Sequence, residues 1–257
     1  MNLANPEASS PTLSVECNQQ ILRLRHSSPS RKKAAAASFA AAAAPNFNRL
    51  AGIYRWMELA SFGPWLERCR FAFLNELTGC RKALLLGDGD GRFTARLLRA
   101  NSSVSIDAVD AGENMLRALL RRAGQNAERV QPHCADIRVW QPAEGHYDLV
   151  VSHFFLDCLT TEEVEALAFK VRDAISPSAI WVVSEFAIPA NRFGRLLARP
   201  VVWGLYWAFG CLTGLKLRSL PQHREVLSIC GWILEQRRLW LGGLLVSEMW
   251  RAGRKST

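Results

Sequence analysis

Short apolar runs alternate with amphipathic helical patterns over most of the chain. The apolar runs predict strands at 82–86, 104–109, 129–134, 147–152 and 180–186. Helical periodicity lies between them, over 92–99, over 113–122 and from Thr160 onward. Because strands that alternate with helices pair in parallel, the pattern predicts a doubly wound α/β sheet covered by helices on both faces.

The ends of these elements carry recognisable signals. Thr160 and Glu163 stand three residues apart before an apolar pattern, which is the spacing of a helix capping box. Near the C-terminus, a helix is expected over 222–230, followed by strands at 232–239 and 244–250. No helix fits between these last two strands, so they must be antiparallel.

The remaining segments are expected to be appendages of one domain. Residues 1–47 are rich in Ser and Pro and then in Ala, and predict a disordered tail or loose helix, with a targeting peptide or an over-extended start as alternatives. The domain itself is expected over 48–257, with N-terminal helices in 48–80, the second of them after Pro64. Residues 190–220 are largely apolar but contain Pro and Gly, and predict a helical cap rather than a membrane span.

Composition narrows the function classes. The chain has 257 residues, of which 49% are hydrophobic, enough for one α/β domain with a sizeable core. Its formal net charge of +9 is spread out, and the basic runs 31–33 and 121–122 are short, so solvated faces are favoured over a nucleic-acid site. Seven cysteines without a C-x-x-C pair argue against a metal site and disulfides and favour the cytoplasm.

The loop after the first predicted strand has glycine at every second position. Gly87, Gly89 and Gly91 allow a sharp turn and the close approach of a ligand. Asp88 and Asp90 stand between them, and two carboxylates would repel a pyrophosphate but tolerate a cationic ligand. The dinucleotide fingerprint would also need glycine at position 92, which is Arg. The loop therefore favours S-adenosylmethionine over a nicotinamide cofactor, with a plain tight turn as the alternative.

Two further acids follow the next strands. Asp110 ends the second predicted strand, where a carboxylate can accept hydrogen bonds from ribose hydroxyls, or can cap the following helix. Asp136 follows the third strand and can accept a hydrogen bond from the adenine amino group, with Ile137 beside the ring. Both positions are expected at the ligand-binding edge of the sheet.

The loops after strands four and five hold the catalytic candidates. His153 can take a proton from an acceptor hydroxyl or acidic carbon, or can be a structural histidine. Asp157 can bind the substrate or steady the amino-acid end of the cofactor. Glu185, after the fifth strand, is a weaker candidate that can equally cap or pair locally.

With these residues in place, the chain resembles the class I S-adenosylmethionine-dependent methyltransferases over roughly 48–250, and among them the ubiquinone/menaquinone C-methyltransferases. The motifs that carry the resemblance are 87–91, 109–116, 135–137 and 147–152. The resemblance implies a Rossmann-like, seven-stranded sheet with an antiparallel last strand, and an N-terminal helix through Tyr54 that closes over the cofactor. The cofactor-binding residues that it implies are Gly87, Asp88, Gly89, Asp90, Gly91, Asp110, Ala111, Asp136, Ile137, Ser152 and Tyr54.

Two departures from the family pattern matter. The family usually has an acid two residues before the first glycine, and this chain has Leu85 there. Either Asp88 or Asp90 then contacts the methionine ammonium, or cofactor affinity is lower. The loop after strand four also lacks the Asn-Pro-Pro-Tyr type of motif, which argues against methylation of nucleic-acid amines.

The sequence thus predicts methyl transfer from S-adenosylmethionine to a small acceptor, apolar or aromatic, resembling a quinone precursor or a lipid. Peripheral membrane contact through 192–215 is expected to accompany such an acceptor. Because of Leu85, a catalytically silent protein that binds S-adenosylmethionine and regulates a partner remains the alternative.

Overall fold

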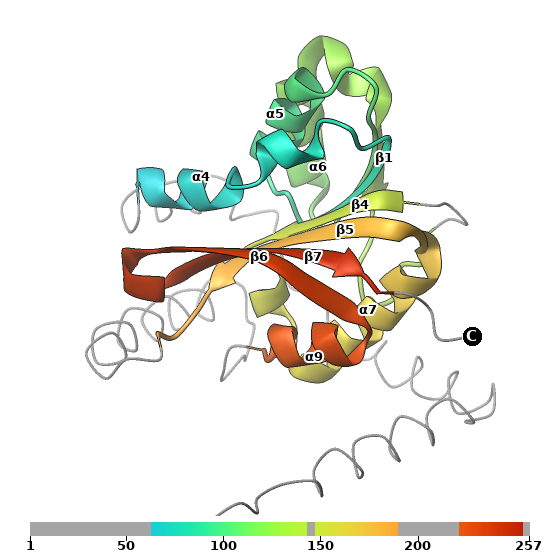
Figure 1. Ribbon diagram of the computed structural model, residues 1–257. Coiled ribbons are helices and arrows are strands. Elements are labelled where there is room, and N and C mark those ends of the chain that lie inside the picture. Colours follow the sequence, from blue (N-terminus) through green and yellow to red (C-terminus); the bar gives the residue numbers. More distant parts are fainter. Residues whose placement is uncertain (1–62, 143–146, 190–220, 254–257) are drawn as a thin grey trace, which may run out of the picture. The chain divides into compact units, whose positions relative to one another are not determined.

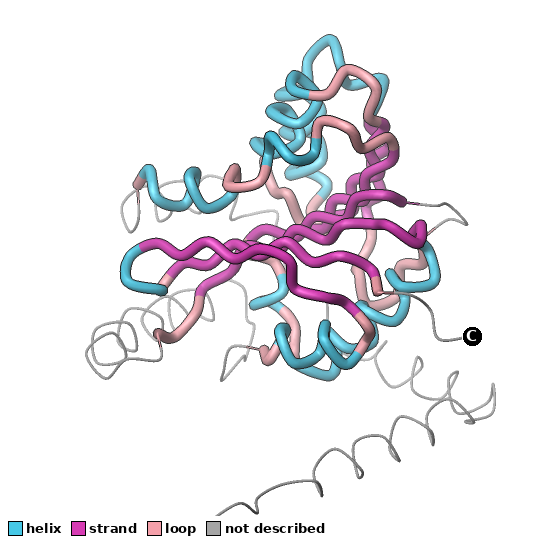
Figure 2. Tube along the Cα trace, in the orientation of Figure 1, coloured by secondary structure: helices cyan, strands magenta, loops and turns pink. Residues whose placement is uncertain are grey.

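The computed structural model describes residues 63–142, 147–189 and 221–253 (Figures 1 and 2). The chain divides into two units, Met1–Ala43 and Ala44–Thr257, and every described element belongs to the second. The predicted N-terminal tail, the helix through Tyr54 and the cap over 190–220 lie outside the described residues.

The second unit is built on a seven-stranded sheet with the order β3-β2-β1-β4-β5-β7-β6. Its first five strands are parallel, and β7 is antiparallel to both of its neighbours, β5 and β6. The predicted fold class is therefore confirmed, with β7 as the reversed strand. The strands are β1 (Lys82–Leu86), β2 (Ser105–Asp110), β3 (Val130–Cys134), β4 (Tyr147–His153), β5 (Ile175–Phe186), β6 (Trp232–Trp240) and β7 (Leu245–Ala252).

Helices cover the sheet on both faces. Figure 1 shows α4, α5 and α6 on one side of the sheet and α7 and α9 on the other. The described α-helices are α4 (Pro64–Arg70), α5 (Arg92–Ala100), α6 (Glu113–Ala123), α7 (Thr161–Ala174) and α9 (His223–Ile229). Short 3-10 segments are η2 (Leu74–Leu77), η3 (Gly124–Arg129), η4 (Leu156–Cys158) and η5 (Leu241–Gly243). None of the helices in the described part of the chain is both long and apolar enough to cross a membrane.

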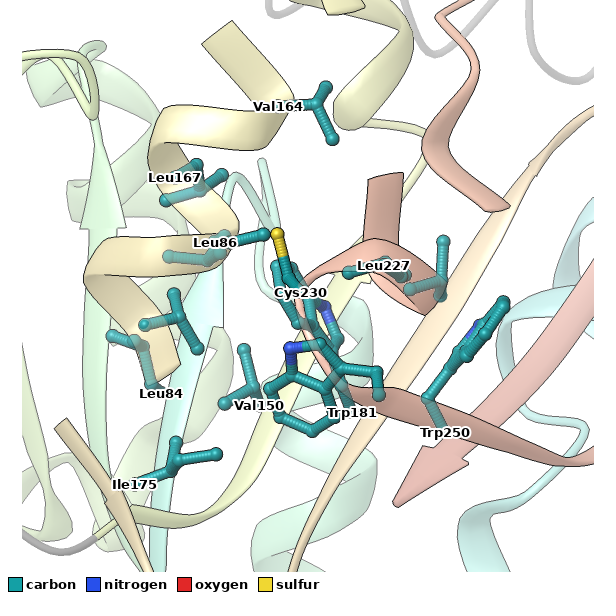
Figure 3. Close-up of a cluster of buried hydrophobic side chains, with 14 of the residues drawn as sticks. Leu84, Leu86, Val150, Val164, Leu167, Ile175, Trp181, Leu227, Cys230 and Trp250 are labelled. Atoms are coloured by element: carbon teal, nitrogen blue, oxygen red, sulfur yellow. The ribbon is translucent and has the colours of Figure 1, made fainter. Parts of the chain in front are cut away.

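Two buried clusters fasten these helices to the sheet. On the α7 and α9 face, one buried cluster includes Leu167 of α7, Leu227 of α9 and the indoles of Trp181 and Trp250 (Figure 3). On the other face, Phe93 of α5 and residues of α6 and η2 join a second cluster over β1, β2 and β4. Burial of one large apolar side chain stabilises the fold by about 1.5–3 kcal/mol. The two clusters therefore fix the positions of the strand ends that face a ligand.

Local signals set the helix ends as predicted. Thr160 accepts a hydrogen bond from the backbone N–H of Glu163, whose carboxylate accepts one from the backbone N–H of Thr160. Pro64 is the first residue of α4, where its missing N–H costs no hydrogen bond.

The strand β5 begins at Ile175 rather than at the predicted 180, because the pairing with β4 shifts register between Tyr147 and Leu149. That irregularity accommodates a Ser-Pro-Ser stretch whose turn-like composition hides the strand.

The third glycine of the loop after β1 is fixed by packing. Gly91 precedes α5 in the left-handed conformation, with φ 79° and ψ 28°. A Cβ there would lie 2.6 Å from the Cα of Leu119 on α6, a backbone atom that cannot step aside. Gly91 therefore lets α6 lie directly against the loop.

Replacing Gly91 by Ala should lower the free energy of unfolding by about 2–4 kcal/mol, because overpacking against α6 adds to the strain of positive φ. Gly242 is the matched control, because it has φ 64° and ψ 18° and open space where its Cβ would be. Gly242→Ala should cost only about 1–2 kcal/mol. Urea unfolding of both variants measures the difference, and equal losses would contradict the packing role of Gly91.

Candidate functional site

The three glycines of the loop after β1 have different surroundings, so each has a different structural role. Gly91 makes room for α6, as described above. A Cβ on Gly87 would lie 2.1 Å from the ring of Phe155, which follows β4 and rests on this glycine. Over Gly89, with φ 58°, nothing lies within 4 Å of a Cβ. Gly89 is therefore where a ligand has room to approach the loop backbone.

A pocket lies beside this loop at the carboxyl ends of β2 and β3. It is lined by Val109, Asp110, Ala111, Ala135, Asp136, Ile137, Arg138, Phe155, Cys158 and Leu159. The structure thus brings together four predicted site residues, Asp110, Ala111, Asp136 and Ile137, which the sequence separates by some 25 positions. The pocket is small, with a volume of about 40 Å³, and its lining sets an apolar wall beside two carboxylates.

Asp110 is the most constrained of these carboxylates. Its Oδ1 accepts a hydrogen bond from the backbone N–H of Gly112 at 2.7 Å. Burial raises its pKa to about 6, although the N–H groups of Gly112 and Gly89 favour the charged form. Asp110 therefore both steadies the start of α6 and offers its second oxygen to a ligand, so the two interpretations of this residue are compatible.

Asp136 is held by a neighbour. Its Oδ1 accepts hydrogen bonds from the backbone N–H and from Nε of Arg138, both at 3.0 Å. Arg138 in turn lies 3.6 Å from Glu163 of the α7 capping box. This chain of contacts fixes the loop after β3 against α7 and positions the pocket wall that contains Ile137.

The two acids of the glycine loop point to different partners. Asp90 forms ion pairs with Arg92 at 3.3 Å and with Arg122 at 2.6 Å, so its charge is already balanced. Asp88 is half-buried, and its Oδ2 accepts hydrogen bonds from Thr94 N at 2.8 Å and Thr94 Oγ1 at 2.6 Å. Burial raises the pKa of Asp88, and Arg70 opposes that rise. Of the two, Asp88 is the acid that remains near the predicted site.

Two residues outside the glycine loop, Leu85 of β1 and Arg70 of α4, also determine which contacts a ligand can make there. Leu85 is 1% exposed and belongs to the apolar cluster under α5, so its position offers a ligand no polar contact. Arg70, the last residue of α4, interacts electrostatically with Asp88 and His153. Arg70 could not be predicted as a site residue, because no periodicity or motif in the sequence indicates that the end of α4 reaches this loop.

His153 lies in the interior rather than in the pocket. Its Nδ1 is 2.8 Å from Ser184 Oγ, which is itself 2.9 Å from Ser247 Oγ. Its ring packs edge-on against Phe93 at 4.6 Å, and burial lowers its pKa well below the usual value. These contacts favour the structural interpretation of His153 over the predicted role as a base.

Two other predicted residues give little side-chain contact with a ligand. The hydroxyl of Ser152 is buried and accepts a hydrogen bond from the indole N–H of Trp181 at 3.0 Å. Only the backbone of Ser152 is therefore left to face a ligand. Tyr54 lies outside the described residues.

A buried and a half-buried carboxyl group, those of Glu185 and Asp157, lie near each other after β4 and at the end of β5. Glu185 is 1% exposed, and its Oε1 accepts hydrogen bonds from the backbone N–H groups of Phe155 at 3.1 Å and Leu156 at 2.8 Å. Its Oε2 is buried without a hydrogen-bond partner. Burial and the nearby Asp157 both raise the pKa of Glu185, while burial raises that of Asp157 to about 6. Glu185 thus holds the loop after β4, where Phe154 has the strained φ of 54°.

Asp157 has a further titratable neighbour on α9. His223 favours the charged form of Asp157, and its Nε2 lies 3.4 Å from Glu248 Oε2 on β7. Glu248 is fully buried and also pairs with Arg224 at 3.1 Å and Arg237 at 3.0 Å. Among the described residues, no group of three or more His, Cys, Asp or Glu side chains is arranged to hold a metal ion.

Part of the chain is similar in sequence to known methyltransferases. Residues 83–178 match the family model described as "Methyltransferase domain". A curated relative, the tRNA1(Val) (adenine(37)-N6)-methyltransferase of Enterobacter sp. (strain 638), is 33% identical over 99 residues, which are 35% of this chain and 40% of that protein. The chain therefore spans less than half the length of this relative.

Solved structures show the same fold at low sequence identity. The S-adenosylmethionine-dependent methyltransferase SibL superposes with a TM-score of 0.58 at 20% identity, over 85% of this chain and 65% of that one. An O-methyltransferase family protein from Burkholderia thailandensis gives 0.62 at 13% identity, over 81% of this chain and 61% of that one. These matches agree with the predicted enzyme class and cofactor and do not single out the quinone-type subfamily. Residues 83–178 therefore match a methyltransferase domain in sequence, and the chain has the fold of S-adenosylmethionine-dependent methyltransferases.

Proposed function

We propose that the whole chain transfers a methyl group from S-adenosylmethionine to a small acceptor. The observation that carries this proposal is the pocket at the ends of β2 and β3, where the half-buried carboxylate of Asp110 lies beside the apolar wall at Ile137 and Phe155. The same edge of the sheet holds the open loop position at Gly89. Both lie within the domain that matches the methyltransferase model.

The described residues suit each part of the cofactor. Asp110 would accept hydrogen bonds from the ribose hydroxyls, and Asp136 and Ile137 would border the adenine. Because Leu85 is apolar and Asp90 is paired with arginines, Asp88 is the proposed partner of the methionine ammonium. Arg70 interacts with Asp88 and would hold the methionine carboxylate. This arrangement replaces the acid that the family usually has at position 85.

When bound, S-adenosylmethionine supplies a methyl group on a positively charged sulfur. The protein's task is to align the acceptor with that methyl group and exclude water, and such alignment can lower a barrier by roughly 7–11 kcal/mol. An acceptor that must lose a proton needs a base. Asp157, whose pKa is about 6, is ionised at neutral pH and is the proposed proton acceptor, with Glu185 fixing its loop.

The proposed acceptor is small and either apolar or aromatic, resembling a quinone precursor or a lipid. Two proteins of similar structure, the mitomycin 7-O-methyltransferase MmcR and the pyocyanin biosynthetic protein PhzM, support a small-molecule substrate. The largely apolar sequence of 190–220 supports the apolar character, and contact with a membrane surface through 192–215 remains part of the proposal. The segment at the end of β4, Ser152 to Phe155, lacks the Asn-Pro-Pro-Tyr type of motif and so does not favour a nucleic-acid amine.

Binding of S-adenosylmethionine should depend on pH through the carboxylate of Asp110. Below about pH 6 the carboxylate of Asp110 takes up a proton, and the neutral carboxyl group is a weaker hydrogen-bond acceptor for the ribose hydroxyls. Calorimetry should therefore show S-adenosylmethionine binding that is constant above pH 7 and weakens up to tenfold between pH 6 and 5. At pH 7.5, Asp110→Asn should bind about 10- to 100-fold more weakly and lose most of this pH dependence.

Asn can still accept the hydrogen bond from Gly112, so Asp110→Asn should keep the wild-type unfolding midpoint within a few degrees. If the wild type gives no binding heat at any pH, the proposed function fails. If the variant binds as tightly as the wild type, Asp110 caps α6 and does not contact the ribose.

A second prediction separates transfer from binding. Asp157→Asn should lower transfer of label from S-adenosylmethionine into a lipid and quinone extract by about 100-fold or more, while cofactor affinity changes less than about threefold. Glu225→Gln, an exposed carboxylate on α9, is the control and should leave both unchanged. Tight binding by the wild type without labelled product would instead support the catalytically silent alternative.

A further inference from the structure

A second concave site lies between α4 and α5, apart from the candidate cofactor pocket. Its volume is about 510 Å³, and it shares no lining residue with that pocket. Four of the side chains that line it are arginines: Arg92, Arg96, Arg99 and Arg122. We call this site the arginine groove.

Helix geometry gathers these arginines. Arg92, Arg96 and Arg99 follow one another at intervals of four and three residues, so they lie along one face of α5 and span about 10 Å. Arg122 comes from the last turn of α6. The groove is therefore assembled from two helices, and the basic run 121–122 supplies only one of its four arginines.

Several of the guanidinium groups are held in place before any ligand arrives. Asp90 pairs with Arg92 at 3.3 Å and with Arg122 at 2.6 Å, and its backbone carbonyl accepts a further bond from Arg122 Nε at 2.9 Å. Arg96 lies over the ring of Phe71, 4.7 Å from its centroid. Side chains fixed in this way lose less conformational entropy when they bind a ligand.

The groove carries an excess of positive charge. Four guanidinium groups line it, and the carboxylates that face them are Asp90 and Glu67, which also lines the groove. Arg122 uses Nε and Nη2 toward Asp90, which leaves other N–H donors for an additional acceptor. Guanidinium groups match the geometry of phosphate oxygens, which accept two parallel hydrogen bonds.

A basic helix face is more often simply solvated. Three features distinguish the arginine groove from such a face: it is concave, its arginines come from two helices, and its floor includes the buried side chains of Leu66 and Ala95. An apolar floor lowers the local dielectric and strengthens the attraction of an anion for the arginines above it.

We propose that the arginine groove binds a phosphate group, carried either by a soluble phosphate compound or by the headgroup of an acidic phospholipid. This site goes beyond the proposed methyl transfer and does not depend on it. A phosphate there would balance the excess charge without displacing the ion pairs of Asp90.

The test uses the full chain and two probes: pyrophosphate in calorimetry, and co-sedimentation with phosphatidylcholine vesicles that contain or lack phosphatidylglycerol. The variant Arg96→Gln/Arg99→Gln removes two exposed arginines of the groove. The matched control, Arg81→Gln/Arg121→Gln, removes the same charge from two exposed arginines that do not line it. S-adenosylmethionine affinity is measured in every sample.

The wild type should bind pyrophosphate, and the groove variant should bind it about 10- to 30-fold more weakly, with a loss below about threefold for the control. Parallel losses on phosphatidylglycerol vesicles identify a headgroup as the source, whereas pyrophosphate binding without vesicle binding identifies a soluble compound.

Equal losses in the groove and control variants would overturn the proposal, because they would reflect net charge alone. So would the absence of binding to both probes. S-adenosylmethionine affinity should stay unchanged in both variants, so a failure of the groove proposal is distinguishable from a failure of the proposed function.

Discussion

The contact between α6 and the glycine loop organises the rest of the site. Gly91 has no Cβ, so Leu119 of α6 lies directly against the loop. Once α6 is there, its first turn presents the N–H of Gly112 to Asp110, and its last turn presents Arg122 to Asp90. One close packing contact thus fixes the carboxylate proposed to hold the ribose and balances the acid that would otherwise compete for the cofactor.

The elements of the sheet could be predicted because each carries a local signal. Six of the predicted strands begin within one residue of their observed starts, and the Thr160 capping box is present with both hydrogen bonds. The start of β5 could not be predicted, since a register shift between two strands has no signature in either strand alone. The reversal of β7 followed from chain length, because too few residues separate β6 and β7 for a crossover.

The candidate site was predictable only in part. Strand-end acids such as Asp110 and Asp136 follow from the rule that ligands bind at the carboxyl edge of a parallel sheet, and the structure brings both to one pocket. The pairing of Asp90 with Arg122, the reach of Arg70 and the position of Phe155 over Gly87 depend on tertiary packing. His153 was a candidate base because of its residue type, but tertiary packing places it in the interior, where it is hydrogen-bonded to Ser184.

The most direct test of this account is a crystal structure of the chain with S-adenosylhomocysteine, the demethylated cofactor. We expect the ribose hydroxyls within hydrogen-bonding distance of Asp110, the adenine beside Ile137, and the amino-acid end between Asp88 and Arg70. A nucleoside bound elsewhere, or an amino-acid end held without Asp88 or Arg70, would contradict it.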